Sequence, residues 1–367
     1  MSGSDVVVVG GGIIGLSVAW TAAARGLSVT LVDDRAETGA TQAAAGMLAP
    51  VGEVSYGEEA LLALNLAAAE RYPQFVTELE ECSGAEVGYR RTGTMVVSRD
   101  LDDQAQVDEL HAYQQSLGLS SRRLRAGECR KLQPGLAPSV RGGLLVEGDH
   151  SVDNRALARA LAVACERARI CVKSERASEV SSGEVRTAAG EVVRGAAVVL
   201  AAGAESGAIA GAPPEVAASV RPVKGQLLHL SGPAEPATLT MTVRGIDAYL
   251  VPRNDGRLIV GATVEEAGFD TRVTAGAVFE LLRAAYELVP GITELSLTET
   301  VAGLRPGSVD NAPLIGETSV PGLFAATGHY RNGILLAPVT ADALVERLVT
   351  GTTPSLIEPF TPLRFAA

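Results

Sequence analysis

The first apolar run of the chain comprises four consecutive valines, Val6 to Val9, and it leads directly into a cluster of glycines. An uncharged stretch from Leu16 to Ala24 follows, and a second apolar run at residues 28–32 ends in Asp33 and Asp34. Short β-branched runs are typical of strands buried on both faces, and the longer stretch between them is typical of a helix. The pattern predicts a strand–helix–strand unit at the start of the chain.

Further along the chain, apolar positions recur at helical spacing in several segments and in short strand-like runs in others. The spacing predicts helices over 58–82, 102–117, 153–168, 274–288 and 339–348. Runs rich in β-branched residues predict a strand pair or hairpin over 89–98 and strands at 142–146, 170–174, 196–204, 226–230, 248–252, 258–262 and 323–326. Turn residues near Gly183, at Gly190 and at 254–256 predict the connecting hairpins.

These elements predict an α/β (α+β) fold in which two domains are interleaved along the chain. A Rossmann-like nucleotide-binding domain is expected from residues 1–85, 145–220 and 300–367. A second domain, built on a mixed or antiparallel sheet that binds the substrate, is expected from residues 86–144 and 221–299.

The glycine cluster carries the first chemical signal. Gly10, Gly12 and Gly15 form a Gly-x-Gly-x-x-Gly turn between the first strand and the first helix, and Asp33 ends the next strand. Glycine allows the tight turn and lets the backbone approach a pyrophosphate, whose charge the helix N-terminus favours. The acid is placed to accept hydrogen bonds from a ribose. The motif predicts a dinucleotide site, and the alternative is a tight turn without a ligand.

Composition and charge exclude several classes of protein. The chain has 367 residues, of which 47% are hydrophobic, and a net charge of −12, which argues against a nucleic-acid partner. The four cysteines form no Cys-x-x-Cys pair, and the four histidines have no metal-ligand spacing, so we expect a reducing cytoplasm and no structural metal. Residues 6–24 are uncharged, but four glycines interrupt them and no basic residue precedes them. We therefore expect no membrane segment.

Several motifs together indicate a known family. They are Gly10-Gly-Gly-Ile-Ile-Gly15, Ala43-Ala-Ala-Gly-Met-Leu48, Arg221-Pro-Val-Lys-Gly225, Tyr249-Leu-Val-Pro-Arg253, Val260-Gly-Ala-Thr263, Ala302-Gly-Leu-Arg-Pro-Gly307 and Gly328-His-Tyr-Arg-Asn-Gly-Ile-Leu-Leu-Ala-Pro338. With these motifs the chain resembles, essentially end to end, the D-amino acid oxidase group of flavoproteins, and within it the glycine oxidases of thiamine biosynthesis.

The resemblance implies a bound FAD. The residues that would contact it are Gly10, Gly12, Ile13, Ile14, Gly15, Asp33, Asp34, Thr41, Gln42, Ala45, Gly46, Met47, Ala177, Gly203, His329, Tyr330, Arg331, Asn332, Gly333, Ile334 and Leu335. Related sarcosine oxidases attach the flavin through a cysteine in the last third of the chain. No cysteine follows Cys171 here, so we expect non-covalent FAD.

The resemblance also implies the substrate side of the site. Arg305 would clamp a substrate carboxylate with two charge-assisted hydrogen bonds, and Tyr249 and Arg331 would assist. Met47 and Val264 would form apolar walls. An ion-paired surface arginine at 305 or 331, and simple packing at the other three positions, are the alternatives. His329 is a minor candidate for a catalytic base.

The implied reaction is oxidative deamination of glycine, sarcosine or small D-amino acids, with hydride transfer to flavin and electrons passed to O₂. A homotetramer is implied as well. Asp247 and Ala248 stand where the glycine oxidases carry bulkier or imidazole side chains, so the choice of substrate stays open. Other possibilities are a flavin-dependent dehydrogenase with another electron acceptor, a non-catalytic nucleotide-binding module and an NAD-dependent dehydrogenase.

Overall fold

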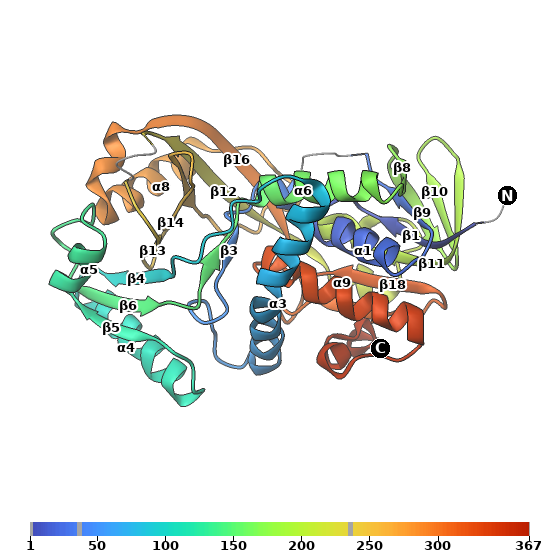
Figure 1. Cartoon of the computed structure of the whole chain (residues 1–367), viewed down its shortest axis with the longest axis horizontal. Coiled ribbons are helices and arrows are strands. Elements are labelled where there is room, and N and C mark those ends of the chain that lie inside the picture. Colours follow the sequence, from blue (N-terminus) through green and yellow to red (C-terminus); the bar gives the residue numbers. More distant parts are fainter. Residues whose placement is uncertain (1–2, 35–38, 234–237, 367) are drawn as a thin grey trace.

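The computed structural model describes residues 3–34, 39–233 and 238–366. Two large sheets form two lobes that lie side by side (Figure 1). The first sheet has the order β17-β18-β11-β1-β2-β8, with the hairpin strands β9 and β10 attached to β11. Its strands are β1 (Ser4–Val9), β2 (Val29–Val32), β8 (Cys171–Lys173), β9 (Ala177–Ser181), β10 (Glu184–Thr187), β11 (Val192–Leu200), β17 (Leu314–Glu317) and β18 (Leu323–Thr327).

The valine run forms the centre of this sheet. β1 pairs in parallel with β11 on one side and with β2 on the other. Val6 and Val8 pack into the core on one face of the sheet, whereas Val7 and Val9 pack into the core on the opposite face. Because successive side chains alternate across a strand, a strand covered on both faces needs a continuous apolar run.

Long helices cover one face of the first sheet. The core between them includes residues of α1 (Ile13–Ala24), α3 (Glu59–Ser83), α6 (Asn154–Arg167) and α9 (Gly333–Thr350). The opposite face is covered by α7 (Pro214–Ala217), the β9–β10 hairpin and short 3₁₀ turns. These turns are η1 (Gly203–Ala208) and η4 (Pro362–Phe365). Of the other 3₁₀ turns, η3 (Ser355–Phe360) packs beside α3 and β17, and η2 (Pro290–Glu294) follows helix α8 (Ala275–Leu288) of the other lobe.

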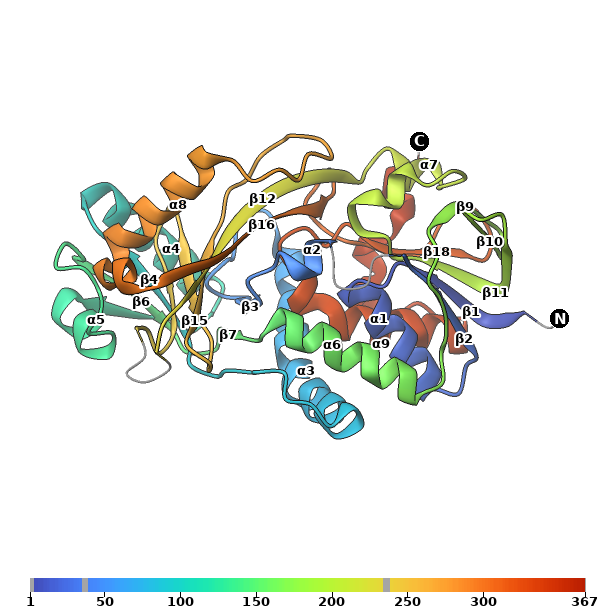
Figure 2. The ribbon, with the colours of Figure 1, turned by 90° about the horizontal axis from the view of Figure 1, so that it is seen from above.

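The second sheet has the order β16-β12-β15-β14-β13-β4-β6-β5 and is antiparallel except between β13 and β4. Its strands are β4 (Thr94–Ser98), β5 (Arg122–Arg125), β6 (Gly142–Val146), β12 (Arg221–Ser231), β13 (Thr242–Arg244), β14 (Tyr249–Pro252), β15 (Arg257–Gly261) and β16 (Ser296–Gly307). The helices of this lobe are α4 (Leu101–Ser116), α5 (Ala126–Leu132) and α8 (Ala275–Leu288). Strands β12 and β16 run from this lobe toward the first sheet (Figure 2).

A short connecting region lies between the two lobes. It contains α2 (Gly39–Gln42) and a small ladder of β3 (Met47–Leu48) with β7 (His150–Ser151). Figure 2 shows α2 between the long strands and helices α1, α6 and α9. Residues 39–48 therefore face both lobes.

The predicted mixed α/β fold is confirmed, and three local expectations need correction. Residues 89–98 form no hairpin; only β4 is a strand, and Arg90 makes an isolated bridge to Ser151. The closing helix begins at Gly333 and not at 339, although Pro338 lies inside it. Strands β6 and β16 run across the expected domain limits at residues 144 and 299, and both belong to the second sheet. The division into two domains itself stays a prediction.

Among the described residues, no helix has both the length and the apolar character needed to cross a membrane.

Candidate active site

A cavity of about 780 Å³ lies where the two lobes meet. Its walls come from the ends of β1 and β2, the connecting residues 39–47, the far end of β16 and the start of α9. A volume of this size is in the range of cofactor and ligand sites.

The glycine turn after β1 has the geometry of a nucleotide site. Gly10 has φ +106°, and a Cβ there would stand 2.5 Å from the carbonyl oxygen of Ala201. A Cβ at Gly15 would stand 1.8 Å from the carbonyl oxygen of Gly10. Both positions therefore require glycine. Gly12 caps α1 without a side-chain hydrogen bond, so the open helix N-terminus faces the cavity and favours a bound phosphate.

The end of β2 supplies carboxylates to the same cavity. Asp33 and Asp34 line it together with Ala177 at the start of β9 and Gly203 at the start of η1. A Cβ at Gly11 would stand 2.7 Å from a carboxylate oxygen of Asp33, so this side chain lies directly against the glycine turn. The arrangement fits recognition of a ribose next to a pyrophosphate.

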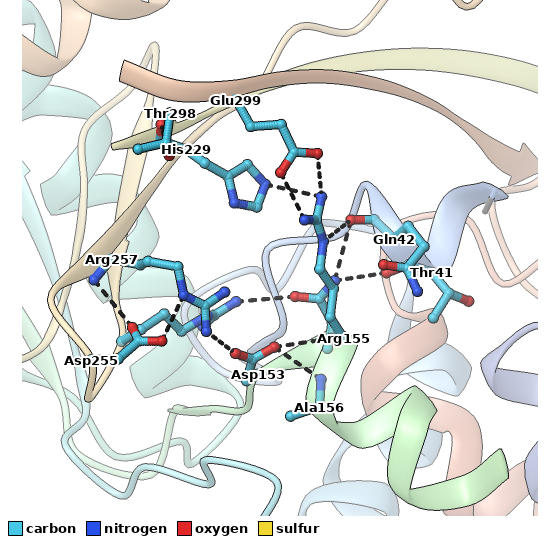
Figure 3. Close-up of polar contacts among 12 residues, drawn as sticks. Thr41, Gln42, Asp153, Arg155, Ala156, His229, Asp255, Arg257, Thr298 and Glu299 are labelled. Atoms are coloured by element: carbon cyan, nitrogen blue, oxygen red, sulfur yellow. Dashed lines mark hydrogen bonds and ion pairs between the residues drawn. The ribbon is translucent and has the colours of Figure 1, made fainter. Parts of the chain in front are cut away.

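The connecting residues 41–45 are held by hydrogen bonds to their backbone carbonyls. Arg155 Nε donates to the carbonyl oxygen of Gln42 at 3.1 Å (Figure 3). Asn154 donates to the carbonyl oxygen of Thr41 at 2.7 Å, and Arg253 donates to that of Ala45 at 2.8 Å. The hydroxyl of Thr41 accepts the backbone N–H of Ile13 at 3.0 Å. The small residues on this segment, Ala43 to Gly46, thus lie at a fixed position against the cavity.

The same polar cluster joins the two lobes. Arg155 at the start of α6 makes two hydrogen bonds, of 2.7 and 2.8 Å, to Glu299 on β16 (Figure 3). Arg257 pairs with Asp153, which also caps α6. His229 lies 3.5 Å from Arg155, and burial lowers its pKa to about 4, so it is neutral at pH 7. Residues from both lobes therefore hold residues 41–45 in position.

At the other end of the cavity lies an arginine without a carboxylate partner. Arg305 on β16 donates to the carbonyl oxygens of Thr263 at 3.1 Å and Lys224 at 3.4 Å. It forms no ion pair with any carboxylate among the described residues. A Cβ at Gly225 would stand 2.3–2.5 Å from the guanidinium. Gly225 therefore provides the space in which the charged group lies, and the unpaired charge is suited to a carboxylate ligand.

Tyr249 faces this arginine from the start of β14. Its ring lies over Gly261, where a Cβ would stand 2.4 Å from the ring and hydroxyl atoms. Burial raises the pKa of the phenol to about 12, although the charge of Arg305 acts in the opposite direction. The hydroxyl is therefore protonated at neutral pH and can donate a hydrogen bond.

Comparison with known proteins decides the family. The family model described as FAD dependent oxidoreductase (DAO) matches residues 5–347. The chain belongs to this family.

Similar proteins include a glycine oxidase of Geobacillus kaustophilus, 33% identical over 98% of this chain and 97% of that protein. The crystal structure of glycine oxidase from that organism superimposes with a TM-score of 0.90, covering 98% of both chains. The bifunctional protein ThiO/ThiG of Nostoc sp. is 33% identical over 97% of this chain, which spans about half (54%) of that longer protein. An iminodiacetate oxidase of Chelativorans sp. is 27% identical, with a TM-score of 0.87 over 97% of this chain and 98% of that one.

The cofactor of this oxidoreductase family is FAD, and the residues present fit it. The turn that needs glycine at positions 10 and 15, the open N-terminus of α1, the acids after β2 and the small residues 43–46 form a continuous wall. Gly333 and Ile334 bring the N-terminus of α9 to the same cavity. None of the four cysteines lines it, as expected for non-covalent FAD.

Most residues predicted for the site line the cavity, but five do not. Those that do are Gly10, Gly12, Ile13, Ile14, Asp33, Asp34, Thr41, Ala45, Gly46, Met47, Ala177, Gly203, Tyr249, Arg305, His329, Tyr330, Arg331, Gly333 and Ile334. Gly15 lies behind the turn, the Gln42 carbonyl faces α6, and Leu335 is packed in the core. Asn332 caps α9 outside the lining, and Val264 is 63% exposed.

Val264 points outward because its neighbour points inward. The hydroxyl of Thr263 accepts the backbone N–H of Gln226 at 3.0 Å, which directs the next side chain to solvent. Arg331 is exposed at the edge of the cavity, with its guanidinium 5.2 Å from the ring centre of Tyr330. The cavity wall predicted at Val264 is therefore absent from the structure.

His329 is buried and held by α9. Its Nε2 lies 3.0 Å from the hydroxyl of Thr340, and burial lowers its pKa to about 3. A histidine that stays neutral throughout the physiological range and is engaged by a neighbour is poorly suited to act as a general base. The residues that sequence reasoning missed are Gly225 and Gly261, which make room for Arg305 and Tyr249, and Glu53, which also lines the cavity.

Proposed function

We propose that this FAD-dependent oxidoreductase is an amino acid oxidase that acts on glycine, and on sarcosine or small D-amino acids, as a member of the glycine oxidase class. The observation that carries the proposal is the unpaired guanidinium of Arg305 at the end of the FAD cavity, beside the protonated phenol of Tyr249. The full-length match to a glycine oxidase supports the same substrate class.

In the proposed reaction the protein binds and orients the substrate. Arg305 donates two parallel hydrogen bonds to the carboxylate, and the Tyr249 hydroxyl donates a further hydrogen bond to it. This fixes the position of the α-carbon, and orientation of this kind is the main task of the protein when a cofactor carries the chemical step. FAD, when bound, would supply the acceptor for the hydride and would pass the electrons to O₂ as hydrogen peroxide. The imine product takes up water and gives the 2-oxo acid, with release of ammonia from glycine or a D-amino acid and of methylamine from sarcosine.

The N-terminus of α9 contributes electrostatically. Gly333 and Ile334 lie at the first turn of this helix and line the cavity, and the helix has no side-chain cap there. The positive end of the helix dipole stabilises negative charge on a group bound in front of it. Arg331, at the cavity edge, would assist in holding the substrate carboxylate.

The wider setting of the enzyme is also part of the proposal. The similarity to the ThiO part of ThiO/ThiG supports a role in forming the thiazole of thiamine. The four cysteines are free, which is consistent with a cytoplasmic protein. The resemblance to glycine oxidases supports a homotetramer that binds neither nucleic acid nor membrane.

A visible spectrum of the purified protein tests the proposal. We expect flavin bands that bleach when glycine, sarcosine or D-alanine is added without oxygen, and peroxide when air returns. Bleaching without peroxide formation would favour a dehydrogenase with another electron acceptor. Flavin bands that none of the three amino acids bleaches would refute the proposed substrate class.

A further inference from the structure

Building on the function proposed above, we propose that Glu53 is a specificity-determining residue: its carboxylate excludes substrates that carry a second negative charge and selects zwitterionic amino acids. Glu53 lines the FAD cavity together with Tyr249 and Arg305.

The charges along the cavity separate into two groups. Asp33, Asp34 and Glu205 line the part that fits the adenosine, near the end of β2 and η1. Of the described carboxylates that line the cavity, Glu53 is the remaining one. Its charge and that of Arg305 both act on the phenol of Tyr249, where Arg305 lowers the pKa and Glu53 raises it. A cation and an anion thus both lie within electrostatic range of the Tyr249 hydroxyl. This pair of charges is complementary to an amino acid, which has one carboxylate and one amino group.

Glu53 is placed by a rigid support. Asp149, which is fully buried, accepts the backbone N–H groups of Val51 at 3.1 Å and Gly52 at 2.8 Å. The carbonyl of Gly52 accepts a hydrogen bond from Arg244 at 2.5 Å, and that of Val51 accepts one from Gln114 at 3.0 Å. Both peptide groups that precede Glu53 are therefore fixed.

Gly52 adds a steric constraint to this support. A Cβ at this position would stand 2.3 Å from a carboxylate oxygen of Asp149, so the turn closes directly onto the buried acid. Glu53 itself is half-buried, and no ion pair or side-chain hydrogen bond links it to another described residue. A carboxylate held at a cavity wall without a partner repels an anionic group of the ligand and attracts a cationic one.

The substrate class follows from this charge. Glycine, sarcosine and D-alanine each have one carboxylate, which Arg305 binds, and an amino group, which the negative charge of Glu53 does not repel. Iminodiacetate and D-aspartate bring a second carboxylate into the same space. Sarcosine and iminodiacetate form a matched pair, because the second replaces the methyl hydrogen of the first with a carboxylate.

The test compares the holoenzyme with Glu53→Gln, Glu53→Asp and Glu58→Gln. Glu58 lies on the same segment but outside the cavity lining, so its variant is the control. The first readout needs no turnover: the dissociation constants of acetate and malonate are measured from the change in the flavin spectrum. We expect Glu53→Gln to lower the malonate-to-acetate ratio of dissociation constants about tenfold, as for removal of one partly screened like charge. Glu53→Asp and Glu58→Gln should keep the wild-type ratio.

The second readout is the ratio of kcat/KM for sarcosine and iminodiacetate. Glu53→Gln should shift this ratio toward iminodiacetate, mainly through KM. An acetate-to-malonate preference that is the same in Glu53→Gln and wild type would overturn the inference, and so would an equal shift in Glu58→Gln. If the wild-type flavin is not reduced by any of the amino acids, the proposed function fails, whereas the two dissociation constants still decide the role of Glu53.

Discussion

Replacing Gly225 with alanine would test the carboxylate clamp without removing a charged group. An added Cβ would lie 2.3–2.5 Å from three atoms of the Arg305 guanidinium, where ordinary contacts begin at about 3.4 Å. The φ of Gly225 lies outside the left-handed region, so the strand accepts alanine. The atoms in the way belong to the end of a flexible side chain. We therefore expect the guanidinium to move by about 1 Å while the fold persists.

The cost should appear in substrate binding. A hydrogen bond to a charged group contributes about 1.5–3 kcal/mol, so losing one of the two bonds of a bidentate clamp corresponds to a rise of about 10- to 150-fold in KM for glycine. FAD should stay bound, because Gly225 lies at the Arg305 end of the cavity and not at the glycine turn. The melting temperature should change by less than about 3 °C.

Anaerobic flavin reduction at increasing glycine concentrations measures this effect, with flavin absorbance as a check on the cofactor. Gly276→Ala is the matched control, since a Cβ at this position on α8 meets no atom within 4 Å. A wild-type KM in Gly225→Ala would refute the reasoning, because the carboxylate could then not depend on the guanidinium at its present position.

Three further variants test other parts of the site. Arg305→Ala should raise KM for glycine by several tens-fold or more, because a buried charge-assisted contact contributes about 2–4 kcal/mol. FAD should stay bound in this variant, and an unchanged KM would mean that another residue binds the carboxylate. Asn154→Ala removes the donor to the Thr41 carbonyl and an acceptor for Arg253, so it should raise the dissociation constant of FAD about tenfold. Ultrafiltration measures this constant, and a wild-type value would contradict the role of this support. Burial raises the pKa of Asp149 to about 7, so the folded protein binds more protons than the unfolded chain between about pH 4 and 7, and stability should fall as pH rises through this window. Urea unfolding of Asp149→Asn should show a flatter pH dependence, and a slope equal to that of the wild type would count against the assignment.

Local patterns marked the glycine turn and the acids after β2, which the structure brings to one cavity. The valine run and the glycines at positions 10 and 15 lie within one strand–turn–helix unit, so their constraints are visible in a short stretch of sequence. Strand pairing was harder to predict. Residues 89–98 have the composition of a hairpin, but β4 pairs with β6 and β13, which lie far along the chain. The closing helix was expected from residue 339, whereas α9 begins at Gly333 and contains Pro338 after its first turn.

The residues that sequence reasoning missed depend on contacts between distant segments. Asp149 supports Val51 and Gly52 from almost a hundred positions away, and no local pattern marks that pair. Gly225 and Gly261 did offer a signal, since glycine inside a strand often marks a close approach by another group. The side chain that lies against each glycine can be identified only from the pairing of the strands.

The continuity of β16 has a consequence for how ligands enter and leave. This strand carries Glu299, which is bonded to α6 of the first lobe, and six residues later it carries Arg305 in the cavity. It is paired with β12 along its length, and such a two-stranded ladder resists bending. We therefore expect the lobes to stay together during turnover, so that amino acids and products exchange by local movement of residues 262–271, which end at Thr271 in the cavity lining.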